Sequence, residues 1–115
     1  MKQTAFIIAG HSNYDPGAPG SDGNSEAEMT KEQRNLVTED LKRINYKGQT
    51  WIDPNGWVNW QVQGHIRSAQ VAGDIAIDLH FNSAANNKAT GVEIFVKENA
   101  PEKDIQWAES LCKKL

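Results

Sequence analysis

The sequence predicts an α/β fold in a single domain, with a mixed, mostly parallel sheet flanked by helices. Strand-like and helix-like segments alternate along the chain in the order β-α-β-α-β-β-α, which is typical of strands joined by helical crossovers. The first strand-like segment is a continuous apolar run, as expected for a strand that is buried on both faces. The chain has 115 residues and no internal repeat or linker, so one domain over 1–115 is expected.

The N-terminal elements are marked by clear boundaries. The first strand is expected at Thr4–Ala9, an apolar run that stops at a glycine. A loop rich in Gly, Pro, Asn, Ser and Asp follows over 10–24. A helix is expected over 25–45, because Ser25 and Glu28 have the spacing of an N-terminal capping box.

The remaining elements follow from hydrophobic pattern and turn residues. A second strand is expected at 51–52, before an Asp-Pro-Asn-Gly turn. Apolar residues at helical spacing predict helices over 58–72 and 102–115. The segments DIAIDLH and GVEIFV predict strands at 74–80 and 91–96.

Composition narrows the function classes. The formal net charge is -3, with twelve basic and fifteen acidic residues and no basic block, so nucleic-acid binding is not expected. Cys112 is the only cysteine, which excludes an intrachain disulfide and a cysteine-rich zinc cluster. The N-terminal apolar run is too short for a signal peptide or a membrane span. We therefore expect no membrane partner and a chain that is cytoplasmic as synthesised.

Two histidines follow predicted strands. His11 comes one glycine after the first strand, and His80 ends the strand expected at 74–80. If these strands are parallel, both imidazoles emerge at the carboxyl edge of the sheet, where open α/β folds bind ligands. Imidazole is the commonest neutral metal ligand, whereas a single histidine at a strand end is more often a hydrogen-bonded surface residue. The sequence leaves both interpretations open.

The helix over 25–45 adds a carboxylate. At 100° per residue, Glu26 projects to the middle of an apolar arc, whereas Glu28, Glu32 and Glu39 project to the opposite side. An inward carboxylate needs a partner because an unpaired buried charge is costly, and two His with one Glu form a known catalytic zinc arrangement. The alternative is that Glu26 only complements the helix dipole. The arc consists of Met29, Leu36, Val37, Leu41 and Ile44.

Four motifs occur in order along nearly the whole chain. Segment 8–20 reads IAGHSNYDPGAPG, and segment 26–37 begins a helix with EAE. Segment 74–82 reads DIAIDLHFN, and segment 91–95 reads GVEIF. Together they resemble the zinc-dependent N-acetylmuramoyl-L-alanine amidases of the Amidase_3 type, whose first motif runs roughly G-H-G-G-x-D-P-G-A-x-G after a strand.

The resemblance implies a phosphorylase/hydrolase-like fold of the Amidase_3 type, with peptidoglycan as substrate and Zn²⁺ as cofactor. By this resemblance His11, Glu26 and His80 are the zinc ligands. The implied reaction cleaves the amide between the lactyl group of N-acetylmuramic acid and L-alanine, as in cell-wall hydrolases and phage lysins. Zinc lowers the pKa of its bound water to about 7, and a carboxylate base then takes the water proton.

The chain departs from the family pattern in two places. The positions after the first histidine, often glycine in the family, are Ser12 and Asn13, which changes the loop without removing a ligand. The family's catalytic glutamate lies on a late strand, beyond the helix over 102–115 in which this chain ends. We therefore expect a missing C-terminal segment, or a second chain that supplies it, and activity of this chain alone stays open. A non-catalytic murein-binding module is the alternative.

Several other side chains are candidates for supporting roles. Glu93 is the in-chain candidate for the catalytic base, although strand alternation turns it away from its apolar neighbours. Asp78 lies two residues before His80, on the same strand face, and is a candidate to orient that imidazole; a structural salt bridge is the alternative. Asn82 and Asn13 are candidates for substrate contacts, and turn formation is the alternative for Asn82.

Aromatic residues gather around the second predicted helix. His65 projects to its apolar side and is interpreted as a core histidine. Trp51, Trp57 and Trp60 surround the Pro-Asn-Gly turn. Their rings can stack on sugars, but packing against the helix is the favoured interpretation.

Overall fold

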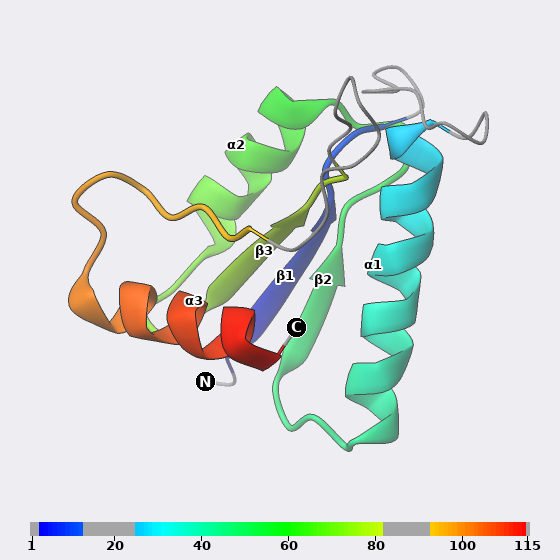
Figure 1. Cartoon of the computed structure of the whole chain (residues 1–115). Coiled ribbons are helices and arrows are strands. Elements are labelled where there is room, and N and C mark those ends of the chain that lie inside the picture. The colour runs from blue at the N-terminus through cyan, green and yellow to red at the C-terminus, as the bar shows by residue number, and fades with distance from the viewer. Residues whose placement is uncertain (1–2, 13–24, 82–92, 115) are drawn as a thin grey trace, which may run out of the picture. The chain divides into compact units, whose positions relative to one another are not determined.

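The computed structural model describes residues 3–12, 25–81 and 93–114. The chain divides into two units, Met1–Ser83 and Ala84–Leu115, which are described separately. The first unit contains a sheet with two helices, and the second contains one helix (Figure 1). The elements are β1 (Thr4–Ala9), α1 (Glu26–Arg43), β2 (Gln49–Ile52), α2 (Asn59–Ala69), β3 (Ile75–Leu79) and α3 (Glu102–Lys114).

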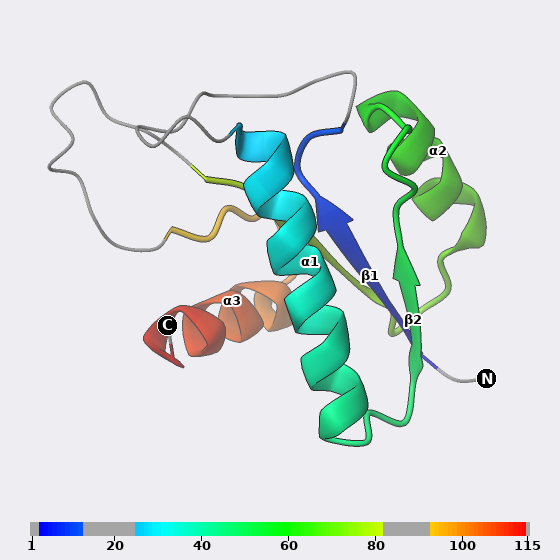
Figure 2. The same cartoon turned by 90° about the vertical axis from the view of Figure 1, so that its right-hand side faces the viewer.

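The three strands form a parallel sheet in the order β2-β1-β3, so β1 is the central strand. The crossover through α1 leads to one edge of the sheet, and the crossover through α2 leads back past β1 to the other edge. Right-handed crossovers in opposite directions place their helices on opposite faces, and Figures 1 and 2 show α1 and α2 in this arrangement. The predicted α/β class is confirmed. One domain over 1–115 stays a prediction.

Strand β1 carries the core because both of its faces are covered. Its residues from Ala5 to Ala9 are at most 4% exposed. Phe6 and Ile8 form the core cluster with Val62 and Ile66 of α2, and the alternate residues of β1 face α1. The prediction of a doubly buried first strand is therefore confirmed.

Helix α1 packs a polar ridge against the sheet. Its buried residues are Glu26, Ala27, Thr30 and Arg34. Glu26, Thr30 and Arg34 follow one another at four-residue intervals, so they lie along one row of the helix. The predicted apolar arc is only partly covered, since Leu36 is 49% and Ile44 is 64% exposed. The arc correctly predicts that Glu26 faces inward, but the hydrophobic pattern does not mark the polar residues Thr30 and Arg34 that are buried beside it.

The start of α1 follows its sequence signal. Ser25 is the N-cap, with extended backbone, and its hydroxyl oxygen accepts from the Glu28 backbone N–H at 3.2 Å. This contact is the serine half of the predicted capping box. The Glu28 side chain is exposed, as expected, whereas Glu26 is 4% exposed. Two glutamates in one helical turn therefore differ: Glu28 takes part in the cap through its backbone N–H, and Glu26 points into the protein.

The second unit contains one confirmed and one wrong prediction. Helix α3 is confirmed, with acidic residues in its first turn and lysines in its last, which complement the helix dipole. The expected strand at 91–96 is wrong over the described residues 93–96, which are irregular and include Phe95 at 81% exposure. Apolar alternation does not by itself make a strand, because the backbone must also find a ladder partner. None of the helices in the described parts of the chain has the length and apolar character needed to cross a membrane.

Candidate metal centre

The carboxyl ends of two neighbouring strands meet the first turn of α1 at one edge of the sheet (Figure 1). β1 and β3 pair in register, with Ala9 beside Leu79, so His11 and His80 follow adjacent strand ends. The direction of the crossovers reverses between these two strands. Such a switch point is where open α/β sheets bind ligands, so the topology brings both histidines to the expected place.

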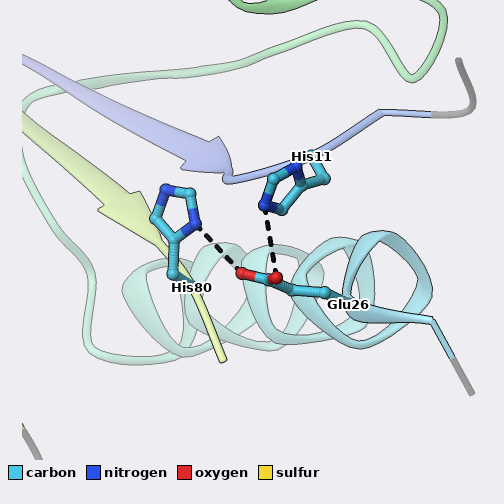
Figure 3. A group of neighbouring side chains, drawn as sticks. All are labelled: His11, Glu26 and His80. Carbon is cyan, nitrogen blue, oxygen red and sulfur yellow. Dashed lines mark hydrogen bonds and ion pairs between the residues drawn. The ribbon is translucent and has the colours of Figure 1, made fainter. Parts of the chain in front are cut away.

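Glu26 lies between the two imidazoles (Figure 3). Its Oε2 is 3.2 Å from His11 Nε2, and its Oε1 is 3.0 Å from His80 Nδ1. The two rings are nearly perpendicular, with centroids 5.1 Å apart. One nitrogen or oxygen atom from each of the three residues lies within 4.8 Å of the others. Residues far apart in the sequence thus offer three donor atoms to one point.

The Glu26 carboxylate is buried but well partnered. Its side chain is 6% exposed, compared with 21% for His11 and 43% for His80. The backbone N–H of Phe81 also donates to Glu26 Oε1, at 3.1 Å. These contacts meet the requirement that a buried carboxylate have partners. They also leave the cluster open to solvent on the His80 side.

Asp78 contacts the outer nitrogen of His80. Its Oδ2 is 3.3 Å from His80 Nε2, so the imidazole connects Asp78 on one side with Glu26 on the other. Burial acts to lower the pKa of His80, but the Asp78 and Glu26 carboxylates outweigh it and hold that pKa above its ordinary value. Desolvation raises the pKa of Asp78, which the neighbouring His80 offsets only in part. Asp78 therefore has the contact needed to orient the imidazole.

The donor set and spacing fit Zn²⁺. Zinc binds histidine nitrogen and carboxylate oxygen at about 2.0–2.2 Å, which separates tetrahedral donors by about 3.4 Å. One donor atom from each of His11, Glu26 and His80 lies within 4.8 Å of the others, so the three could close on one ion by small side-chain movements. Three protein donors with a fourth position left open are typical of catalytic rather than structural zinc sites. His11, Glu26 and His80 are therefore the residues that could hold the ion.

The other predicted site residues are placed less fully. Asn13 and Asn82 lie outside the described residues. Glu93 is exposed in the irregular segment of the second unit, and its role as a base stays a prediction. His65 is half-buried and stacks on Trp51 with ring centroids 4.4 Å apart, which agrees with a packing role.

The first unit contains a buried ion pair that was not predicted from the sequence. Arg34 Nη1 lies 3.2 Å from Asp53 Oδ1, with side chains 4% and 3% exposed. The sequence marks Asp53 only as part of an Asp-Pro-Asn-Gly turn. The available signal was helical spacing, because Arg34 lies two four-residue steps after Glu26 and so belongs to the same row.

Comparison with known proteins agrees with the geometry of the site. The family model Amidase_3, described as N-acetylmuramoyl-L-alanine amidase, matches residues 5–115. The matched range covers nearly the whole chain and includes His11, Glu26 and His80. A comparison with curated proteins finds no match. With the α/β fold and this match over almost its full length, the chain belongs to the Amidase_3 family of N-acetylmuramoyl-L-alanine amidases.

Proposed function

We propose that this chain is a Zn²⁺-dependent amidase that cleaves the bond between the lactyl group of N-acetylmuramic acid and L-alanine in peptidoglycan. It would act as a bacterial cell-wall hydrolase or a phage lysin. The observation that carries the proposal is the cluster of His11, Glu26 and His80, whose donor atoms lie within 4.8 Å of one another. Family membership supports amidase chemistry, and the cluster supports its dependence on zinc.

The residues of the cluster divide the work of binding. Bound Zn²⁺ supplies Lewis-acid polarisation of the amide carbonyl and a water molecule whose pKa is lowered to about 7. His11 and His80 contribute neutral imidazoles, and Glu26 contributes the only negative charge among the three. With Zn²⁺ held by these three residues the site would keep a net positive charge, which would stabilise negative charge on the amide oxygen.

With Zn²⁺ bound, Asp78 would hold a proton on Nε2 of His80, which lies 3.3 Å from its Oδ2. When Asp78 accepts from His80 Nε2–H, the lone pair of the imidazole is placed on Nδ1. Nδ1 is the nitrogen that lies 3.0 Å from Glu26 Oε1. Asp78 would thus favour the tautomer that metal binding requires. In the metal-free protein Nδ1 faces a carboxylate oxygen of Glu26, and the charged ring is the stabilised form.

The test combines metal analysis with product analysis. Purified protein should bind about one zinc per chain and release stem peptides with a free L-alanine amino group from cell-wall sacculi. Glu26→Gln should reduce both zinc content and peptide release. Glu28→Gln is the matched control, because Glu28 lies in the same helical turn with an exposed side chain; it should change neither.

Two results would count against the proposal. A folded chain that stays metal-free in excess zinc removes its basis. Zinc binding with retention on sacculi but without peptide release identifies a murein-binding module instead of an amidase.

A further inference from the structure

We propose that the buried ion pair of Arg34 and Asp53 positions Glu26 relative to the two histidines and so determines how tightly the cluster holds a divalent metal. Arg34 and Asp53 are positioning residues, because the contacts that define them are with each other and with neighbouring protein groups. The inference rests on the metal site of the proposed function. Its test includes a readout in the metal-free protein, so the two can fail separately.

The guanidinium of Arg34 is held by several acceptors in a buried setting. Nη1 donates to the Asp53 carbonyl oxygen at 2.8 Å and to Asp53 Oδ1 at 3.2 Å. Nη2 donates to Asn55 Oδ1 at 2.8 Å, and both Nε and Nη2 lie 3.2 Å from Asn35 Oδ1. Removing one partner of a buried ion pair strands the other charge. The position of Arg34 is therefore tightly constrained.

Asp53 extends this constraint to the end of β1. The same atom that meets Arg34, Asp53 Oδ1, also accepts the backbone N–H of Ala9 at 3.0 Å. Ala9 is the last residue of β1 and lies two residues before His11. One carboxylate oxygen thus joins helix α1 to the strand that presents the first histidine.

Helix α1 carries the constraint from Arg34 to Glu26. The two residues are eight positions apart on one row, which is about 12 Å along the axis, with the fully buried Thr30 between them. The most buried residues of this helix besides Ala27 are polar, so its polar contacts contribute to its position together with its apolar packing. Metal ligands must lie within about 0.2 Å of their bonding distance. A small shift of α1 would therefore move the Glu26 carboxylate relative to the two histidines and weaken metal binding.

Two variants test the ion pair. Arg34→Met removes the guanidinium with little change in length, and Asp53→Asn removes the charge while keeping an oxygen for the Ala9 N–H. We expect each to weaken zinc affinity by roughly tenfold, the lower end for groups that support metal ligands. If the pair acts as a unit, the double variant should be no weaker than the worse single variant. Competition with a chromophoric chelator measures the affinity.

A control separates positioning from general loss of stability. Ile66→Ala opens a cavity in the core between β1 and α2, outside the pocket that His11, Asp53 and Val62 line. We expect it to lower the melting temperature and to leave zinc affinity within about twofold of the wild-type value. A substitution that shares no partner with the metal ligands should not change how they bind the ion.

The metal-free readout is the ¹⁵N chemical shift of the imidazoles. In the wild-type protein the shifts of His11 and His80 report their contacts with Glu26. Both shifts should move in Arg34→Met and Asp53→Asn but not in Ile66→Ala. If the wild-type protein binds no zinc, the proposed function fails while these shifts still test the positioning. Folded ion-pair variants with wild-type affinity and wild-type shifts overturn the inference, as do losses of zinc affinity no larger than that of Ile66→Ala. Asp53→Asn carries the test if Arg34→Met does not fold.

Discussion

Gly10 lies directly against the imidazole of His80. A Cβ atom at residue 10 would come within 2.5 Å of His80 Cε1 and 2.6 Å of its Nδ1, closer than Cβ atoms approach other atoms in proteins. The Gly10 backbone N–H donates to the Leu79 carbonyl oxygen at 2.7 Å, which holds the ends of β1 and β3 together. The missing side chain at Gly10 therefore gives the second histidine the space it occupies beside Glu26.

Gly10→Ala should disrupt the metal centre. The new methyl group must displace either the His80 ring or the backbone after β1, so we expect roughly tenfold weaker zinc binding and a loss of about 1–3 kcal/mol in the free energy of unfolding. Zinc titration and urea unfolding measure the two effects.

Gly64→Ala is the matched control, because nothing lies within 4 Å of a Cβ at that position in α2. It should leave zinc binding unchanged and stabilise α2 by up to about 1 kcal/mol. Wild-type zinc affinity in Gly10→Ala would contradict the conclusion that the His80 ring needs the space beside Gly10 to bind the metal.

The cluster of His11, Glu26 and His80 could be predicted because each member carries a local signal. The two histidines follow apolar runs that had to be strands, and Glu26 opens a helix marked by its Ser25 cap. Parallel pairing then brings adjacent strand ends to one edge of the sheet. Local pattern and topology were enough to place these side chains near one another.

The ion pair of Arg34 and Asp53 could not be predicted in the same way. The two residues are 19 positions apart, and a pairing of this kind depends on tertiary packing rather than on periodicity. An arginine on a helix and an aspartate before proline each have a common surface interpretation. The strand predicted at 91–96 is wrong over the described residues 93–96 because a local pattern was present without a tertiary partner. Its apolar alternation fits a strand but does not specify a neighbouring strand.

The protonation of His80 should be visible in the pH dependence of the metal-free protein. Its raised pKa means that the charged imidazole is stabilised by Asp78 and Glu26 in the folded state. This contribution to stability is complete below the unfolded-state pKa of about 6.5 and is lost as pH rises through the higher folded-state value. Zinc competes for the neutral ring, so zinc affinity should rise with pH over the same interval.

An NMR titration of His80 checks this expectation directly. The midpoint should lie above about 6.5 in the metal-free protein and move to lower pH in Asp78→Asn, which removes the carboxylate that lies 3.3 Å from Nε2. A midpoint below the ordinary histidine value, or one that Asp78→Asn does not change, would show that these carboxylates do not stabilise the charged ring.

Two tryptophans beside the same turn should respond differently to truncation. Trp51 stacks on His65 and meets the ring of Phe6 at 5.8 Å, whereas Trp60 is 74% exposed. Trp51→Ala should lower the free energy of unfolding by about 2 kcal/mol, less than for a fully buried tryptophan because Trp51 is only half-buried. Trp60→Ala should change it by less than about 0.5 kcal/mol, as is usual for surface positions. Urea unfolding of both variants measures the difference. Equal losses would mean that Trp60 also packs in the folded protein, and would remove the exposed ring face that stacking on a sugar requires.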